Sequence, residues 1–517
     1  MKRESVLKGT VLLTLSGFFN RGLGFILKMI LARTIGAGGL GLFQMVHPLF
    51  TTLMLICTAG LPLSLSKLIP EKIVSGRLKD IEHLLKICLL FTLMSGIIST
   101  VLLYLTAEYI AGSIYNNPNL YYTIMGLLPV LTICPLAAVF KGYFQGCKTM
   151  KPTALARTTE QINRFTATII IIHLLRNLEV KYQTTGIGLG IAIGELTALL
   201  LLFYLFISEK NILSEKENNK NTVETTPVNK LFLQIMKISL PVTSGRIVNS
   251  LMMSIKAFLI PGQLKQSGLS AARAAALYGQ LGGMVQQVLF LPIVITGSLT
   301  TSFIPSLAAA YADNNYAKIE RNYRDIIRLA TYLGLPLTAI FHLYGQQICD
   351  LLFSYPEAGK ILSGLAFGST FLYYLQLSTG FLNALGHPGT ALKNITVGSL
   401  LQLAGIYFLV RNPAFRIQGA VIAINSGLIV SALLNYLTIG KIIGFPGQYK
   451  LLFLKPLFSS CIFYILYSGF NHFFLHIYSK FFSYFIFFLF LLLNIIAYLI
   501  LMYLSGAVRK KDLARFF

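Results

Sequence analysis

Charged side chains inside long apolar segments are the residues of this chain that could do chemistry. Arg21 and Lys28 lie seven positions apart in one apolar run, so on a helix they share a face. Arg246, Asn249 and Lys256 follow the spacing i, i+3, i+10 in a later run and share a face as well. A charge at the centre of a bilayer costs about 2.5–3.5 kcal/mol on insertion scales, so each of these side chains needs a functional or structural reason.

Two further apolar runs carry charged residues, and the first of them carries both signs. In the run 153–175, Arg157, Glu160 and Arg164 are three and four positions apart, so they either line a cavity or neutralise one another along one helix. In the run 187–207, Glu195 is either a proton-coupling group or the structural partner of an arginine.

Cations outnumber carboxylates inside these runs, six against two. This excess favours an anionic ligand such as a diphosphate, because a guanidinium donates two parallel hydrogen bonds to a phosphate group. The alternative for the two lysines is that they extend to a membrane interface. We expect the substrate cavity to be lined by Arg21, Lys28, Arg157, Arg164, Arg246, Asn249 and Lys256.

The sequence contexts do not support an enzyme or a metal site. The glycines of 36–41 match a dinucleotide fingerprint but follow an apolar helix, not a strand. His472 and His476 have the spacing of metal ligands but no acidic residue close by. We therefore expect no enzyme activity, no cofactor and no metal, and coupling to an ion or to the membrane potential stays open.

The elements that position these charges are membrane helices. Hydrophobic residues make up 55% of the chain and charged residues 12%, with a mean hydropathy of +0.70. A soluble domain has about 25% charged residues. The apolar runs are continuous and about 20 residues long, which fits spanning helices and not barrel strands. We predict an all-α integral membrane protein of about fourteen transmembrane helices. They are expected at 10–31, 44–64, 86–106, 121–140, 153–175, 187–207, 237–260, 277–304, 326–344, 361–382, 391–410, 417–439, 451–470 and 481–505.

The net charge of +25 reflects topology and not nucleic-acid binding. With a cytoplasmic N-terminus, 28 of the 43 Lys and Arg residues fall in inward segments, nine in outward loops and six inside helices. This bias follows the positive-inside rule. We predict a multi-pass protein of the cytoplasmic cell membrane with both termini in the cytoplasm, where the basic excess also attracts anionic membrane lipids.

Two sequence echoes predict an internal repeat. Gly186 and Gly194 open one run, and Gly419 and Gly427 open another at an offset of 233, each pair eight residues apart. Gly142 and Gly380 begin a second pair of similar segments at an offset of 238. Because six crossings preserve orientation, we predict two six-helix lobes as a parallel pseudo-repeat around a cavity. The predicted parts are an N-terminal lobe 1–207, a cytoplasmic linker 208–236, a C-terminal lobe 237–440, and 441–517 with two appended helices and a basic tail.

Several motifs resemble one protein family. They are Leu7-Lys-Gly-Thr, Arg21-Gly-Leu-Gly-Phe25, Ala32-Arg33-x-Ile-Gly36, Gly142-Tyr-Phe-Gln-Gly146, Glu160-Gln161-x-x-Arg164, Gly194-Glu195-Leu, and Ser239-Leu-Pro-x-Thr243 with Arg246. In order along the chain, they resemble the stage V sporulation protein B family. That family belongs to the polysaccharide-transport branch of the multidrug, oligosaccharidyl-lipid and polysaccharide exporter superfamily.

The resemblance implies a V-shaped, two-lobed fold and an alternating-access flippase or exporter. Its implied cargo is an undecaprenyl-diphosphate-linked glycan such as a peptidoglycan precursor, with a role in spore cortex or cell-wall synthesis and with cell-wall enzymes as partners. MurJ-type lipid II flippases share the Arg21-x-Leu-Gly-Phe pattern. Lys28 and Gln280 stand near positions where those proteins have further cavity arginines, so lipid II itself is a weaker inference than a lipid-linked glycan.

Two alternatives stay open. A cation-coupled multidrug exporter of the same superfamily would have a cavity dominated by acids, whereas cations dominate here. A membrane glycosyltransferase would need an acidic catalytic loop, and Asp313, Glu320 and Asp325 lie among as many cations. A non-transporting membrane scaffold for cell-wall enzymes belongs to this second class of alternative.

Overall fold

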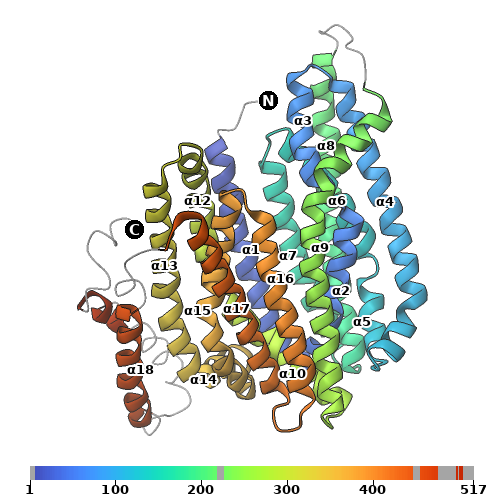
Figure 1. Cartoon of the computed structure of the whole chain (residues 1–517). Coiled ribbons are helices and arrows are strands. Elements are labelled where there is room, and N and C mark those ends of the chain that lie inside the picture. Colours follow the sequence, from blue (N-terminus) through green and yellow to red (C-terminus); the bar gives the residue numbers. More distant parts are fainter. Residues whose placement is uncertain (1–5, 218–225, 446–453, 475–495, 499, 505–517) are drawn as a thin grey trace. The chain divides into compact units, whose positions relative to one another are not determined.

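The computed structural model describes residues 6–217, 226–445, 454–474, 496–498 and 500–504 (Figure 1). Every regular element within these ranges is an α-helix or a short π-helix. Helices satisfy all backbone hydrogen bonds within one segment, which a lipid environment requires. In the described ranges, nine helical segments are long and apolar enough to cross a membrane. The predicted class, an all-α membrane protein, is confirmed.

The chain folds into two compact units, and unit 1 comprises Met1–Lys265 and Leu269–Gly279. Figure 1 colours its helices from blue through green. They are α1 (Val6–Thr34), α2 (Gly36–Thr58), α3 (Leu61–Val74), α4 (Leu78–Tyr109), η1 (Ile110–Ile114), α5 (Leu120–Leu127), α6 (Val130–Gly146), α7 (Lys151–Leu174), α8 (Val180–Glu217), α9 (Val228–Gln266) and α10 (Ala271–Tyr278).

Unit 2 comprises Gln266–Gly268 and Gln280–Phe517. Its helices are η2 (Gly279–Val285), α11 (Gln286–Phe290), α12 (Ile293–Ala312), α13 (Tyr316–Leu343), α14 (Gly345–Phe353), α15 (Pro356–Ala384), α16 (Pro388–Gly405), η3 (Ile406–Val410), α17 (Ile417–Ile443) and α18 (Lys455–Phe474).

The division between the units differs from the predicted lobes, because α9 packs with unit 1. Leu231 and Ile235 of α9 lie in the same apolar core as Leu65 of α3 and Phe144 of α6. The predicted linker 208–236 is also shorter than expected: α8 continues to Glu217 and α9 begins at Val228. Glu and Lys are good helix formers, so the polar composition of 208–217 does not prevent a helix. The six-helix repeat stays a prediction.

Several predicted spans have a different form in the structure. The run 277–304 is divided among α10, η2, α11 and α12, with Pro292 at the last break, where the missing backbone N–H interrupts a helix. The runs 153–175, 361–382 and 451–470 overlap α7, α15 and α18, which are helical but not among the nine candidate spans. Most of the predicted span 481–505 lies outside the described residues, so the total of fourteen stays a prediction.

Candidate anion-binding site

Glycines on α8 let this helix approach α7 closely. Gly186, Gly190 and Gly194 are four positions apart and share one face. A Cβ atom on Gly194 would lie 2.7 Å from the backbone oxygen of Glu160 and 2.8 Å from Cβ of Arg164. A larger residue at this position would therefore push the two helices apart. The close approach lets Glu195, the next residue of α8, reach the polar face of α7.

Four charged side chains from α6, α7 and α8 meet at this contact. Nη2 of Arg164 lies 2.6 Å from Oε1 of Glu160 and 3.2 Å from Oε1 of Glu195. Nζ of Lys141 lies 2.8 Å from Oε2 of Glu160 and 3.8 Å from Oε2 of Glu195. We call Lys141, Glu160, Arg164 and Glu195 the four-charge network. It holds two positive and two negative charges, so it is neutral as a group.

The two cations of the four-charge network are more exposed than its two carboxylates. The side chains of Arg164 and Lys141 are 24% and 16% exposed, against 13% for Glu160 and 7% for Glu195. Two buried atoms have no hydrogen-bond partner among the described residues, namely Nε of Arg164 and Oε2 of Glu195. Arg164 is therefore the most accessible member of the network and Glu195 the most enclosed, and the network does not use all of its hydrogen-bonding capacity.

The cations of α1 face the polar side of α7. A Cβ atom on Gly24 would lie 3.4 Å from the side-chain nitrogen of Gln161 on α7. Arg21 and Lys28 are three and four positions from Gly24 and share its face. Arg21 is exposed and Lys28 is half-buried. Neither forms an ion pair with a carboxylate within the part of the chain that the structure describes.

Two residues near these cations were not singled out from the sequence. Lys141 was assigned to an inward loop because the predicted helix ended at residue 140, whereas α6 continues to Gly146. Lys141 lies between two apolar residues, Phe140 and Tyr143, and these were a usable signal for the longer helix. His47 of α2 lies within electrostatic range of both Lys28 and Arg164. The sequence contained no signal for His47, because it lies in the predicted apolar span 44–64, which contains no charged residue.

Arg157 lies outside the four-charge network. It is exposed and, within the described residues, pairs with no carboxylate, although it is only three positions from Glu160. Of the two readings of this segment, mutual neutralisation along the helix therefore holds for the Glu160–Arg164 pair and not for Arg157.

The polar stripe of α9 lies in unit 1, as α1 does, and borders the face of α9 that contacts α2. Arg246 and Asn249 are exposed, and Lys256 is half-buried. The hydrogen bonds to Thr52 of α2 come instead from Ser250 and Ser254, at oxygen–oxygen distances of 2.8 Å and 3.0 Å. At 3.6 residues per turn, Ser250 is about one turn beyond Arg246, whereas Asn249 and Lys256 lie further around the helix. Its place in a cavity stays a prediction.

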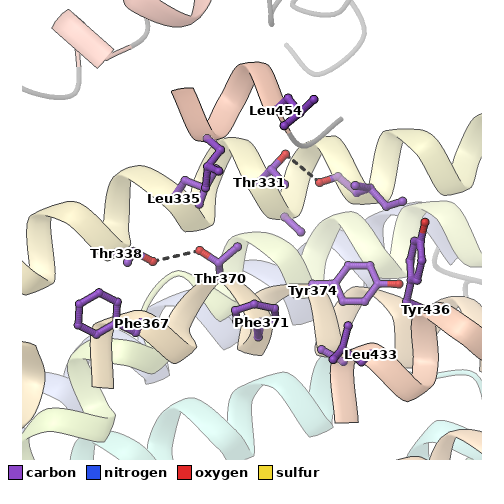
Figure 2. Close-up of a pocket in the computed structure, with 14 residues that line it drawn as sticks. Thr331, Leu335, Thr338, Phe367, Thr370, Phe371, Tyr374, Leu433, Tyr436 and Leu454 are labelled. Carbon is purple, nitrogen blue, oxygen red and sulfur yellow. Dashed lines mark hydrogen bonds between the residues drawn. The ribbon is translucent and has the colours of Figure 1, made fainter. Parts of the chain in front are cut away.

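Unit 2 contains a pocket of about 590 Å³ between α13, α15, α17 and α18. Figure 2 shows its polar groups, which are hydroxyls: Thr338 and Thr370 lie 3.0 Å apart, and Tyr374 and Tyr436 line the same wall. Thr331 adds one more hydroxyl, the remaining lining residues are apolar, and none is charged. This pocket supplies no counter-charge for a phosphate, so the four-charge network and the α1 cations are the stronger candidate for an anion.

The chain matches two family models. One, described as polysaccharide biosynthesis protein, covers residues 6–311, which is more than half of the chain. The chain belongs to the polysaccharide biosynthesis protein family. A second model, MatE, covers residues 281–408. The four-charge network, the α1 cations and the α9 stripe all lie within the first match.

Curated relatives of this polysaccharide biosynthesis family member cover most of its length. Stage V sporulation protein B of Bacillus subtilis is 28% identical over 446 residues, 86% of this chain and 85% of the relative. Lipid II flippase MurJ of Bacillus subtilis is 22% identical over 472 residues, 87% of this chain and 85% of the relative. The resemblance predicted from the motifs is confirmed.

Solved structures of transporters share the fold of this polysaccharide biosynthesis family member. An inward-facing multidrug resistance MATE family transporter of the MOP superfamily matches with a TM-score of 0.70 at 16% identity, over 82% of this chain and 94% of that one. Lipid II flippase MurJ in an inward closed conformation matches with a TM-score of 0.69 at 16% identity, over 98% of this chain and 100% of that one. At these identities the likeness shows the fold alone.

Proposed function

We propose that this protein moves a lipid-linked anionic glycan across the cell membrane by alternating access. The proposed cargo is an undecaprenyl-diphosphate sugar, and a peptidoglycan precursor is the favoured form, in cell-wall or spore cortex synthesis. The chain is a multi-pass membrane protein of the flippase or exporter type. The names of its relatives, a lipid II flippase and a sporulation protein, support the finer proposal.

One observation carries the choice of an anionic cargo. Arg21 and Lys28 face α7 without a carboxylate partner in the described residues, close to a network whose own cations are its more exposed members. Facing lipid, these cations would forfeit their hydration, whereas in a wet cavity they keep water until a phosphate replaces it. A diphosphate supplies two neighbouring anionic groups, which match cations distributed over two adjoining helices.

Arg157, Arg246, Asn249 and Lys256 belong to the proposed cavity as well. Arg157, Arg246 and Asn249 are exposed and Lys256 is half-buried. A transport site near the membrane midplane must bind its cargo from both sides. The proposed orientation, with both termini in the cytoplasm, follows from the excess of Lys and Arg in the inward segments.

A multidrug exporter is the second candidate, because the MatE model and the likeness to MATE transporters favour it. An exporter of cationic drugs needs unpaired acidic groups in its cavity. In the described part of this chain, Glu160 and Glu195 are both paired with Arg164 and Lys141. The charge distribution therefore favours an anionic cargo.

Flipping by the purified protein in vesicles tests the proposal. Vesicles containing a fluorescent undecaprenyl-diphosphate-linked disaccharide should expose it to the opposite leaflet faster with the protein than without it. The double variant Arg21→Ala/Arg246→Ala should lose this activity at unchanged reconstitution. Equal rates in protein-containing and protein-free vesicles would exclude a flippase for this cargo.

A further inference from the structure

Glu160 and Glu195 lie where they would compete with an anionic ligand for the same two cations. Each is within ion-pair distance of both Arg164 and Lys141. We propose that these two carboxylates are resident counter-ions that the cargo's diphosphate displaces from Arg164 and Lys141, and that they reclaim the cations when the cargo leaves. The inference rests on the proposed function and adds Lys141 as a ligand of the diphosphate.

The geometry of Arg164 makes such an exchange feasible. Its Nη2 atom contacts both carboxylates, at 2.6 Å and 3.2 Å, while its buried Nε has no hydrogen-bond partner in the described residues. The strongest arginine–carboxylate pairs use two parallel N–H donors on two oxygens. Arg164 therefore holds its two partners through one nitrogen, and a phosphate that engages a second donor gains a hydrogen bond.

The contacts of Lys141 and the relative exposure of the four side chains point the same way. Lys141 lies 2.8 Å from Glu160 but 3.8 Å from Glu195, which is beyond hydrogen-bond distance, so its second pair is weak. Arg164 is the most exposed member of the network and Glu195 the least, so an approaching anion can reach the guanidinium of Arg164 more easily than the carboxylate of Glu195.

The four-charge network is neutral as a group, and this neutrality should help the cargo to leave. A cavity with only cations would bind a diphosphate tightly and hold it, whereas a conducted ligand must bind weakly enough to leave. Carboxylates within ion-pair distance of the cations offer them an alternative partner in every cycle. Removing one carboxylate leaves a net positive charge, so anion binding should become tighter and turnover slower.

A purely structural network would behave differently. In that case the ion pairs only join α6, α7 and α8, and replacing one carboxylate would lower thermal stability without tightening anion binding. The affinity for an anion therefore distinguishes the two roles. It should rise in the carboxylate variants if the carboxylates are counter-ions, and it should not rise if they are only structural.

Anion binding to the full-length protein in nanodiscs tests the inference. The probes are inorganic pyrophosphate and undecaprenyl diphosphate, and the variants are Glu195→Gln and Glu160→Gln, so that one remains if the other fails to fold. We expect each variant to bind both probes about tenfold more tightly than the wild type, as for the loss of one close competing charge. The disaccharide flipping rate should fall at the same time. Glu179→Gln is the matched control, because Glu179 is 72% exposed and pairs with Lys181.

The outcomes separate the inference from the proposed function. If the wild type bound neither probe and flipped no diphosphate-linked disaccharide, the proposed function would fail. If the wild type bound undecaprenyl diphosphate but both variants bound it no more tightly than Glu179→Gln does, the counter-ions would be structural and the inference overturned. Tighter binding of pyrophosphate alone would assign the site to free diphosphate and overturn the lipid-linked form.

Discussion

At the scale of single residues, the type of cation matters as much as its charge. Arg21, exposed on the face of α1 that contacts α7, can present a planar fork to a phosphate. Lys28, one turn beyond Gly24 on the same face, offers a point charge on a flexible stem. The two side chains are therefore expected to have different parts in binding: orientation of the diphosphate for Arg21, and charge for Lys28.

Substitution at Arg21 tests this difference. Arg21→Ala should abolish flipping of a diphosphate-linked glycan, and Arg21→Lys should restore part of it, leaving a rate at least about tenfold below the wild type because the bidentate contact is lost. The initial rate in vesicles, normalised to reconstituted protein, measures the effect. Full activity of Arg21→Lys would show that charge alone is sufficient there.

A buried ion pair at the start of α4 gives a second prediction at this scale. Nζ of Lys72 lies 3.0 Å from Oδ2 of Asp80, and both side chains are buried. Asp80 also accepts hydrogen bonds from the backbone and the hydroxyl of Thr226, at 2.9 Å and 2.6 Å. Asp80→Ala leaves Lys72 buried without its counter-charge, which should cost about 3–5 kcal/mol of stability.

The thermal midpoint of the detergent-solubilised protein should fall accordingly for Asp80→Ala. The double variant Lys72→Met/Asp80→Ala is the control, since it removes both charges and should recover much of the loss. A midpoint for Asp80→Ala equal to that of the wild type would mean that the pair contributes nothing to holding the start of α9.

At the scale of elements, glycine spacing decides which helices come close. Gly194 of α8 packs on the backbone of α7 at Glu160, and Gly427 of α17 packs on the backbone of α16 at Gly398. These are the two glycines that the sequence placed in corresponding positions of a repeat. Each meets the helix that precedes its own, and the six-helix repeat stays a prediction.

Gly194→Val tests the close contact of α7 with α8. The added side chain would collide with Glu160 and Arg164, so we expect a loss of about 1–3 kcal/mol of stability together with slower flipping, because the four-charge network is displaced. Thermal midpoints and flipping rates measure both effects. Gly38→Ala is the control, since a Cβ atom there has nothing within 4 Å. If both variants behaved alike, the close approach would not matter.

The elements also show why the sequence predicted some contacts and not others. The Glu160–Arg164 pair follows from i, i+4 spacing, so the sequence contains it. The pairing of Arg164 with Glu195 and of Lys141 with both carboxylates joins residues far apart in the chain, which periodicity does not encode. The packing of α9 in unit 1 was missed for the same reason. The polar linker 208–236 indicated a boundary between two lobes, whereas Ile235 of α9 packs in the core of unit 1.

At the scale of the whole molecule, charge asymmetry predicts the orientation in the membrane. The inward segments carry about three times as many Lys and Arg residues as the outward loops. In a background without native cysteines, a cysteine at position 220 should react with a membrane-impermeant maleimide only in inverted vesicles, and one at position 108 only in intact cells. The opposite pattern would reverse the proposed direction of transport.

The central claim is that the cargo is recognised by the negative charge of its diphosphate. The most direct measurement compares two lipids in the same vesicles: a fluorescent disaccharide on undecaprenyl diphosphate, and the same disaccharide on undecaprenol through an uncharged linkage. The wild type should flip the diphosphate-linked form and leave the neutral form at the protein-free rate, and Arg21→Ala/Arg164→Ala should flip neither. Equal transport of both lipids by the wild type would contradict this account.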